Sequence, residues 1–242
     1  MRIALIGYGK MGKTIEKIAQ ERGHTISHLF DSKNPFENAS NCDADVAIEF
    51  TQPDRVVQNI QTAFAQNLPI VVGTTAWQSA LPEVQKAQAI HQGSLLHASN
   101  FSLGVNLFQS LVSHLAKIIS PYPEYAIEIE EIHHTQKLDS PSGTAISIAE
   151  NILQNNVNYQ SWQVVESETD LLQNHALPIT AQRIENVPGT HRIHAKSKID
   201  TLSLEHVAHS RDGFALGAVL AAEWLQGKKG IFTMQDVLQL NH

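Results

Sequence analysis

Two short segments carry side chains whose types and spacing could do chemistry. The first is His133-His134-Thr135-Gln136-Lys137, which follows a stretch of alternating apolar and polar residues. Histidine exchanges protons most readily near neutral pH, and Lys137 adds a positive charge nearby. Neighbouring residues of a strand point to opposite faces, so the two histidines need not share a role. The plainer alternative is that the histidines are partly buried strand residues and Lys137 is a solvated loop charge.

The residues after this cluster predict a helix whose start could hold a carboxylate. Ser140 fits an N-cap and Pro141 fits the first helical position. The backbone N–H groups of Ser142, Gly143 and Thr144 are then expected to be free to bind an anion. Gly143 lets an anion come close, and Thr144 adds a hydroxyl donor.

The second segment is glycine-rich and has the complete pattern G-x-G-x-x-G: Gly7-Tyr8-Gly9-Lys10-Met11-Gly12. It follows an apolar stretch at 3–6 and opens an expected helix at 11–22, the context in which this pattern binds a dinucleotide. Glycine lets the backbone approach a pyrophosphate, whose charge then faces the positive end of the helix. The alternative is a glycine-rich turn without a ligand.

Asp31, at the end of the second expected strand, could accept hydrogen bonds from an adenosine ribose. It favours a free 2′-hydroxyl, as in NADH. Lys33 is close enough in sequence to pair with the 2′-phosphate of NADPH, and Lys10 and Lys13 could reach other phosphates. The choice between NADH and NADPH therefore stays open.

The elements that position these residues fall into two parts. In the first part, short apolar strands alternate with helices, which is typical of a doubly wound parallel sheet that binds ligands at the carboxyl ends of its strands. We expect strands at 3–6, 24–30, 46–50, 69–72 and 94–97, and helices at about 11–22, 51–65 and 81–90.

From about residue 100 the pattern changes. We expect helices at about 103–119, 141–153 and 213–225, strands at 125–132, 179–187, 192–197 and 201–209, and a surface loop at 154–160. No long helix separates the last strands, which favours a mixed or antiparallel sheet with helices on one face. The expected fold class is therefore α/β, a Rossmann-type doubly wound parallel sheet followed by an α+β domain with a mixed sheet.

Composition excludes several classes of protein. The 242 residues carry a formal net charge of −7, which disfavours broad binding to nucleic acid or to an anionic membrane. Cys42 is the single cysteine, so an internal disulfide and a multi-cysteine zinc site are excluded, and a cytoplasmic location is expected. No apolar stretch approaches the length of a membrane span. We expect no metal, because His24 and His28 would lie roughly 13 Å apart along a strand.

With these motifs in place, the chain resembles the dihydrodipicolinate reductase family of bacterial lysine biosynthesis. The resemblance extends from the first strand to the last helix and rests on four segments: Gly7–Gly12, Gly73–Thr75, Asn100–Asn106 and Glu131–Ala145. The last segment is the most specific. The chain departs from the family at Ala76 and Trp77, since the family often has glycine after its Gly-Thr-Thr motif.

The resemblance implies site residues. NADH or NADPH is bound by the Gly7–Gly12 loop and Asp31, and the nicotinamide end lies beside two backbone segments, Gly73, Thr74 and Thr75, and Ala98, Ser99, Asn100 and Phe101. His133 is the proton donor or acceptor, and Lys137 is the second donor. His134, Gly143 and Thr144 hold the substrate carboxylates. Further candidates for carboxylate contact are Arg183, His191 and Arg211.

The family also implies an activity and an assembly. The reaction is NAD(P)H-dependent reduction of 4-hydroxy-tetrahydrodipicolinate, through dihydrodipicolinate, to tetrahydrodipicolinate in the diaminopimelate route to lysine. Residues 1–101, completed by a return helix at 211–242, form the dinucleotide-binding domain. Residues 102–210 form the substrate-binding and oligomerisation domain, through whose sheets the family assembles as a homotetramer.

Two alternatives remain at this point. Another nicotinamide-dependent oxidoreductase, such as an aspartate dehydrogenase, would explain the glycine-rich loop but not the histidines, Lys137 and the following helix start together. A non-catalytic redox sensor would bind the dinucleotide but would need no proton donor beside an anion site.

Overall fold

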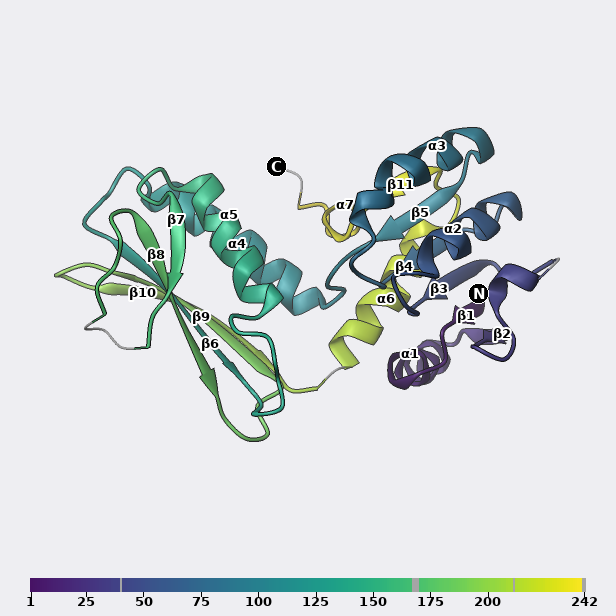
Figure 1. Ribbon diagram of the computed structural model, residues 1–242, viewed down its shortest axis with the longest axis horizontal. Helices are drawn as coiled ribbons and strands as arrows, with labels where there is room; N and C mark the ends of the chain where they lie inside the picture. Colours follow the sequence, from purple (N-terminus) through teal and green to yellow (C-terminus); the bar gives the residue numbers. More distant parts are fainter. Residues whose placement is uncertain (40, 167–169, 211, 241–242) are drawn as a thin grey trace. The chain divides into compact units, whose positions relative to one another are not determined.

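The computed structural model describes residues 1–39, 41–166, 170–210 and 212–240. The chain divides into two compact units (Figure 1). The first unit comprises residues 1–103 and 212–242, and the second comprises residues 104–211. Within the described residues, no helix combines the length and the hydropathy needed to cross a lipid bilayer.

The first unit is built on a six-stranded parallel sheet with the strand order β11-β5-β4-β3-β1-β2. Its strands are β1 (Arg2–Ile6), β2 (Thr25–Phe30), β3 (Val46–Glu49), β4 (Ile70–Val72), β5 (Ser94–His97) and β11 (Gly230–Phe232). Its helices are α1 (Lys10–Glu21), α2 (Val56–Ala65), α3 (Leu81–His91), α6 (Asp212–Leu225) and α7 (Met234–Leu238), with short 3₁₀ turns η1 (Phe36–Asn38) and η2 (Gln78–Ala80).

Both faces of this sheet are covered by helices, which explains why its strands are continuous apolar runs. Along β1, Ile3 and Leu5 pack with α1 and α6 on one face. Ala4 and Ile6 pack with α2 and α3 on the other face. The chain leaves β1 toward β2 on one side and returns as β3 on the other, so the carboxyl end of β1 is the topological switch point at which doubly wound sheets bind ligands.

The second unit has a five-stranded mixed sheet with the order β10-β9-β6-β8-β7. Its strands are β6 (Ala126–His133), β7 (Ser161–Val164), β8 (Ala176–Arg183), β9 (Gly189–Lys196) and β10 (Thr201–Ala208), and its helices are α4 (Leu103–Ile119) and α5 (Gly143–Asn155). β9 is antiparallel to both β6 and β10, whereas β8 is parallel to both β6 and β7. The expected fold class is confirmed.

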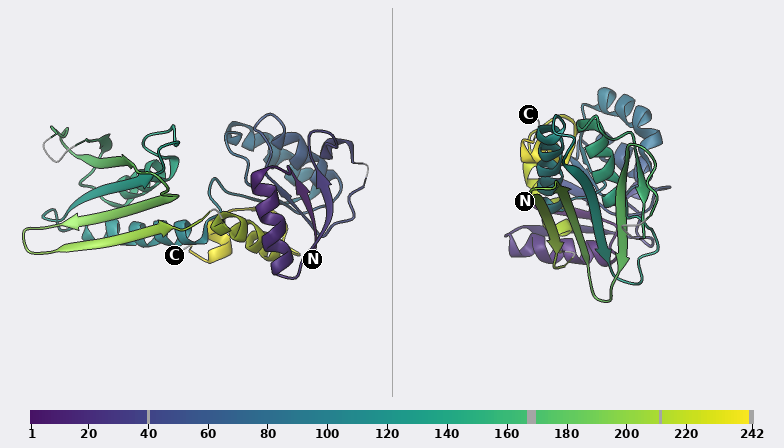
Figure 2. Two further views of the ribbon diagram at one scale, coloured as in Figure 1. Left: turned by 90° about the horizontal axis from the view of Figure 1, so that it is seen from below. Right: turned by 90° about the vertical axis from the view of Figure 1, so that its left-hand side faces the viewer.

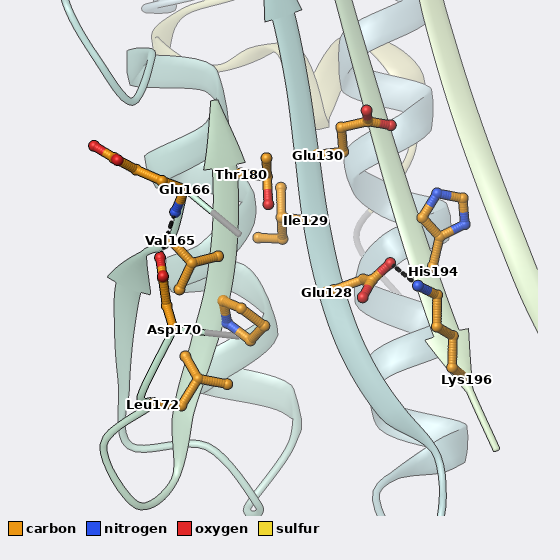
Figure 3. A pocket seen from close by; sticks show the side chains of 11 residues that line it. Glu128, Ile129, Glu130, Val165, Glu166, Asp170, Leu172, Thr180, His194 and Lys196 are labelled. Carbon is orange, nitrogen blue, oxygen red and sulfur yellow. Dashed lines mark hydrogen bonds and ion pairs between the residues drawn. The ribbon is translucent and has the colours of Figure 1, made fainter. Parts of the chain in front are cut away.

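The two faces of this sheet differ in character (Figure 2). Ile127 and Ile129 of β6 pack in the core beneath α4 and α5. The alternate residues, Glu128 and Glu130, point to the other face, where they line a pocket together with His194 of β9 (Figure 3). Because the side-chain period of a strand is two, the residues after Ile129 on the helix-covered face are Glu131 and His133.

Several boundaries differ from the sequence-based expectation. The short elements β7, β11 and α7 were not expected, and α5 runs to Asn155 into the expected loop. The expected N-cap at Ser140 and first helical position at Pro141 are wrong, because Ser142 caps α5 with its own side chain, which accepts a hydrogen bond from the backbone N–H of Ala145.

Candidate active site

The glycine-rich loop at the end of β1 has three glycines with three different surroundings. Gly7 has a φ of +94°, and a Cβ there would overlap the carbonyl oxygen of Phe50. A Cβ at Gly12 would overlap the carbonyl oxygen of Gly7, so this glycine allows α1 to pack against the loop. Gly9 is exposed with open space around its Cα. The loop thus turns tightly, packs closely and leaves room at its centre, as a pyrophosphate requires.

No side chain caps the start of α1, where Gly9 is the N-cap residue. The N–H groups of its first turn therefore donate to no N-cap side chain. They form the positive end of the helix dipole. The neighbouring Tyr8 donates its hydroxyl hydrogen to Glu16, and this bond raises the pKa of Tyr8. Lys10 and Lys13 are exposed beside the loop. The uncapped start of α1 and the two exposed lysines are suited to bind the phosphates of a dinucleotide.

Asp31 directly follows β2 and is exposed. Its Oδ1 accepts hydrogen bonds from the backbone N–H groups of Asn34 at 3.0 Å and Lys33 at 2.8 Å. These bonds, the one from Asn34 first, lower the pKa of the Asp31 carboxyl. The carboxylate is therefore ionised and fixed in direction at the strand end, where a ribose hydroxyl could donate to it.

The Gly73–Thr75 loop leaves β4 and is supported by a buried acid that the sequence reasoning missed. A Cβ at Gly73 would overlap the ring of Phe50. The backbone N–H of Thr51 donates to Oγ1 of Thr74 at 2.8 Å. Burial raises the pKa of Glu49. Hydrogen bonds from Thr51 and Thr74 lower it, but burial outweighs them. Glu49 thus contacts Thr74 of this loop and Thr51 of the neighbouring strand end.

The segment Ala98–Phe101 leaves the neighbouring strand β5 in the same unit. The backbone N–H of Ala98 donates to the carbonyl of Val72 at 3.3 Å, and Oδ1 of Asn100 accepts from the N–H of Ser102 at 2.8 Å. Ser99 is exposed, and Phe101 is buried. The structure therefore places all the cofactor candidates of the first unit at or near the carboxyl ends of parallel strands.

In the second unit, four polar side chains meet on the helix-covered face of the mixed sheet. Glu131 lies directly opposite His191 on β9, and His133 lies directly opposite Arg183 on β8. Nδ1 of His133 is 3.4 Å from Oε2 of Glu131, and Nε2 of His191 is 3.8 Å from the same oxygen. The guanidinium of Arg183 is 3.3 Å from Oε1 of Glu131. Strand register therefore assembles this cluster around one carboxylate.

Glu131 is fully buried. Burial alone would raise its pKa, but the close contact with His133, the hydrogen bonds from Ser142 and the charge of His133 outweigh this effect and lower the pKa of Glu131 to about 2. His191 behaves in the opposite way, because burial first and the neighbouring His133 second lower its pKa to about 4. Near neutral pH the cluster thus contains an ionised Glu131 and an uncharged His191.

The ring of His133 also depends on a glycine in the neighbouring strand. A Cβ at Gly189 would lie 3.0 Å from Nε2 and 3.3 Å from Cδ2 of His133. The side chain of His133 is 10% exposed, so the ring is packed but not sealed from solvent. Gly189 therefore leaves the space in which this imidazole lies.

The start of α5 differs in one respect from the expectation of three free N–H groups. The N–H of Ser142 is not free, because it donates to Oε1 of Glu131 at 2.9 Å. Gly143 is exposed and Thr144 is partly exposed at the first two helical positions. The open part of the helix start is therefore at Gly143 and Thr144.

Lys137 and Asp139 form an ion pair beside this helix start, with Nζ 2.9 Å from Oδ1. Lys137 is the main cause that lowers the pKa of Asp139, and a hydrogen bond from the backbone of Gly143 contributes to the same shift. A carboxylate of the chain itself is thus held by a lysine and a helix N-terminus together.

The remaining candidates have different outcomes. Nδ1 of His134 is buried and has no hydrogen-bond partner within the part of the chain that the structure describes. The structure brings Arg183 and His191 into the Glu131 cluster. Arg211 lies outside the described residues.

One ligand atom each of Glu131, His133 and His191 lies within 4.8 Å of the others, a spacing that would admit a metal ion. The guanidinium of Arg183 already brings a positive charge to the same carboxylate, which disfavours a second cation there. That no metal takes part stays a prediction.

Sequence reasoning missed Glu131, Gly189 and the capping role of Ser142. A signal for Glu131 was present, because the apolar face of β6 at Ile127 and Ile129 continues to a carboxylate. A charged residue on the core face of a strand needs a partner and so marks a site. Gly189 carried no comparable signal, since its role depends on the strand across from it.

Comparison with known proteins agrees with this arrangement. Residues 1–101 match the model of the dihydrodipicolinate reductase N-terminus, and residues 104–238 match that of its C-terminus. The chain is 46% identical over 98% of both chains to 4-hydroxy-tetrahydrodipicolinate reductase of Christiangramia forsetii, and 33% identical over 96% of both chains to that of Rickettsia rickettsii. It shares its fold with a dipicolinate-bound dihydrodipicolinate reductase from Paenisporosarcina sp. TG-14, with a TM-score of 0.78, 22% identity, and coverage of 96% of this chain and 97% of that one. The two family models together cover nearly the whole sequence, and the chain belongs to the dihydrodipicolinate reductase family.

Proposed function

We propose that His133 and Lys137 supply the proton in the reduction of a cyclic dicarboxylate, while His134, Gly143 and Thr144 hold its carboxylates. Membership of the family makes the protein an NAD(P)H-dependent oxidoreductase that reduces 4-hydroxy-tetrahydrodipicolinate in the diaminopimelate route to lysine. The division of roles among these residues is the proposed part.

The first unit fits the dinucleotide. Gly7 and Gly12 let the loop turn and pack where any Cβ would overlap a backbone carbonyl, and Gly9 has open space around it. The N-terminus of α1 would hold the phosphates and Asp31 the ribose, and the backbone of Gly73–Thr75 and of Ala98–Phe101 would hold the nicotinamide end. When bound, NADH or NADPH supplies the hydride.

The second unit binds and protonates the substrate. Loss of water from the substrate gives a conjugated imine, and addition of a hydride to its ring carbon would leave the anion of an enamine. His133 or Lys137 donates one proton to the carbon of this anion, and this proton transfer completes the reduction. General acid catalysis of this kind is worth about 10²–10⁴-fold in rate.

One observation carries this proposal. The carboxylate of Asp139 already occupies a position between Nζ of Lys137 and the backbone of Gly143. A place that holds a carboxylate of the chain is suited to a carboxylate of a substrate. The solved reductase of similar fold from Paenisporosarcina sp. TG-14 holds dipicolinate, itself a cyclic dicarboxylate.

We further propose a cytoplasmic homotetramer that assembles through the sheet of the second unit. The face of this sheet away from the helices carries Glu128, Thr180 and His194 around a pocket (Figure 3), and the edge strand β10 has the exposed apolar residues Leu202 and Val207. Sedimentation equilibrium of the full chain should give four times the monomer mass. A monomer across the concentrations used for activity would refute this assembly.

The activity is tested with the purified chain and a freshly generated cyclic imine. We expect the absorbance of NADH or NADPH to fall only when the imine is present. Binding of NADH without any such fall would support a nicotinamide-binding sensor instead. Comparing kcat/KM for NADH and NADPH then settles the preference that Asp31 and Lys33 leave open.

A further inference from the structure

We infer that Glu131 is a positioning residue for His133: its carboxylate fixes which ring nitrogen carries the hydrogen and ties the imidazole to the start of helix α5. This inference rests on the proposed role of His133 as proton donor. It concerns how the chain prepares that donor, which neither the family match nor the reaction specifies.

The sheet fixes the relative position of the two side chains. Glu131 and His133 are two residues apart on β6, so both lie on the helix-covered face. Directly across from them lie His191 on β9 and Arg183 on β8. Because both neighbouring strands are hydrogen-bonded to β6, the contact does not depend on a mobile loop.

The two oxygens of Glu131 have different partners. Oε1 accepts the N–H of Ser142 at 2.9 Å and lies 3.3 Å from the guanidinium of Arg183. Oε2 faces Nδ1 of His133 at 3.4 Å. Both atoms are buried, and neither has a hydrogen-bond partner among the described residues, so the 3.4 Å contact is an ion-pair distance between two groups that face each other.

This contact determines the tautomer. An ionised carboxylate only accepts hydrogen bonds, so the nitrogen that faces it must carry a hydrogen. Nδ1 of His133 is therefore the protonated nitrogen of the neutral ring, and Nε2 is the nitrogen left to exchange a proton with the substrate. The pKa of Glu131, lowered to about 2, keeps the carboxylate ionised in the pH range of the reaction.

Charged and titratable groups surround His133 on its own strand, on the neighbouring strands and in the loop that follows. On β6 there is Glu131, on β8 Arg183, on β9 His191, on β10 His206 near His191, and in the following loop Lys137 with Asp139. Burial and His133 lower the pKa of His191 to about 4, so His191 is uncharged near neutral pH. Glu131 is thus the negative group in direct contact with the His133 ring.

The test replaces Glu131 by glutamine, which keeps the size of the side chain. Its amide oxygen can still accept from Ser142 and Arg183, and its NH₂ group then faces Nδ1 and favours the other tautomer. We expect Glu131→Gln to lower kcat by about 10–100-fold. We also expect KM for NADH to be unchanged, because Glu131 belongs to the second unit and not to the unit that carries the glycine-rich loop.

Glu150→Gln is the matched control, because Glu150 is an exposed carboxylate on α5 in the same unit. It should leave kcat as in the wild type. The inference is wrong if Glu131→Gln also leaves kcat unchanged, if both variants lower kcat equally, or if the loss in Glu131→Gln is matched by a rise in KM for NADH. An inactive wild type would instead refute the proposed function.

A second measurement needs no variant at Glu131. The ¹⁵N shifts of the His133 ring in the wild-type protein report which nitrogen carries the hydrogen, and the signals are assigned by their loss in His133→Gln. We expect a hydrogen on Nδ1 and a bare Nε2 in the neutral ring. A hydrogen on Nε2 with a bare Nδ1 would overturn the inference.

Discussion

Glu131 and His133 lie on the same face of β6, with Oε2 of the buried carboxylate 3.4 Å from Nδ1 of the imidazole. The other oxygen of Glu131 accepts the N–H of Ser142, which caps α5. One carboxylate therefore joins the proposed proton donor to the helix start proposed to bind the substrate. A substitution that moves the His133 ring is therefore expected to move the start of α5 as well, and the reverse.

Gly189 provides the first prediction. In Gly189→Ala the new Cβ would lie 3.0 Å from Nε2 of His133, closer than ordinary packing allows, so the ring must shift. We expect kcat to fall roughly tenfold, since small misplacements of a reacting group are costly. A double-mutant cycle checks the cause: in a His133→Gln background, Gly189→Ala should have little further effect on kcat. An equal loss in both backgrounds would show that Gly189 acts elsewhere.

His191 predicts how stability depends on pH. Its pKa is lowered to about 4 by burial first and His133 second, whereas the unfolded chain has the ordinary value near 6.5. The unfolded state therefore binds a proton that the folded state does not between these values, and stability falls as the pH drops from about 6.5 to 4. Glu131, with its pKa lowered to about 2, acts in a lower window, where stability is lost below about 4.5.

In His191→Gln, this loss between pH 6.5 and 4 should shrink by on the order of 1–3 kcal/mol. Urea unfolding across this range measures it. The control is His91→Gln, because His91 is exposed at the end of α3. A pH dependence identical to that of the wild type in His191→Gln would show that His191 is not buried in its neutral form.

Ala76 predicts a gain in stability. Its φ is +62°, in the left-handed region that glycine adopts at no steric cost and where an alanine is strained by about 1–2 kcal/mol. Ala76→Gly removes this strain, but glycine also adds entropy to the unfolded chain, which cancels part of the gain. The net stabilisation should therefore be at most about 1 kcal/mol. Thermal unfolding measures the change.

Gln92→Gly is the comparison for Ala76→Gly, since Gln92 has a φ of +50° at the end of α3, away from the Gly73–Thr75 loop. Both variants relieve the same kind of strain, but only Ala76→Gly should alter KM for NADH. A destabilised Ala76→Gly protein would mean that the alanine side chain contributes packing that outweighs its backbone strain.

The sequence predicted what depends on local pattern. The glycine spacing at Gly7–Gly12 and the apolar runs around it were sufficient to predict the parallel sheet, because a strand covered on both faces has a distinctive composition. Both short strands that were not predicted, β7 and β11, have only four and three residues and depend on pairing with β8 and β5.

The part of the site that the sequence could not predict depends on contacts across strands. The cap of α5 was placed at Ser140 instead of Ser142, because the bond that holds Ser142 comes from Glu131, eleven residues away on β6. Likewise, Gly189 and His191 gain their places from the register of β9 against β6. Register is set by the packing of all the strands together and by the turns between them, so the pattern of one strand does not show which residue lies opposite.

The central claim is that His133 delivers a proton to the reduced substrate, and one comparison tests it most directly. The kcat for reduction of the cyclic imine and the Kd for NADH are measured side by side for the wild type and His133→Gln. We expect kcat to fall by about 10²–10⁴-fold with the Kd for NADH unchanged. A His133→Gln protein with the kcat of the wild type, or one whose loss of activity is matched by loss of NADH binding, would contradict the account.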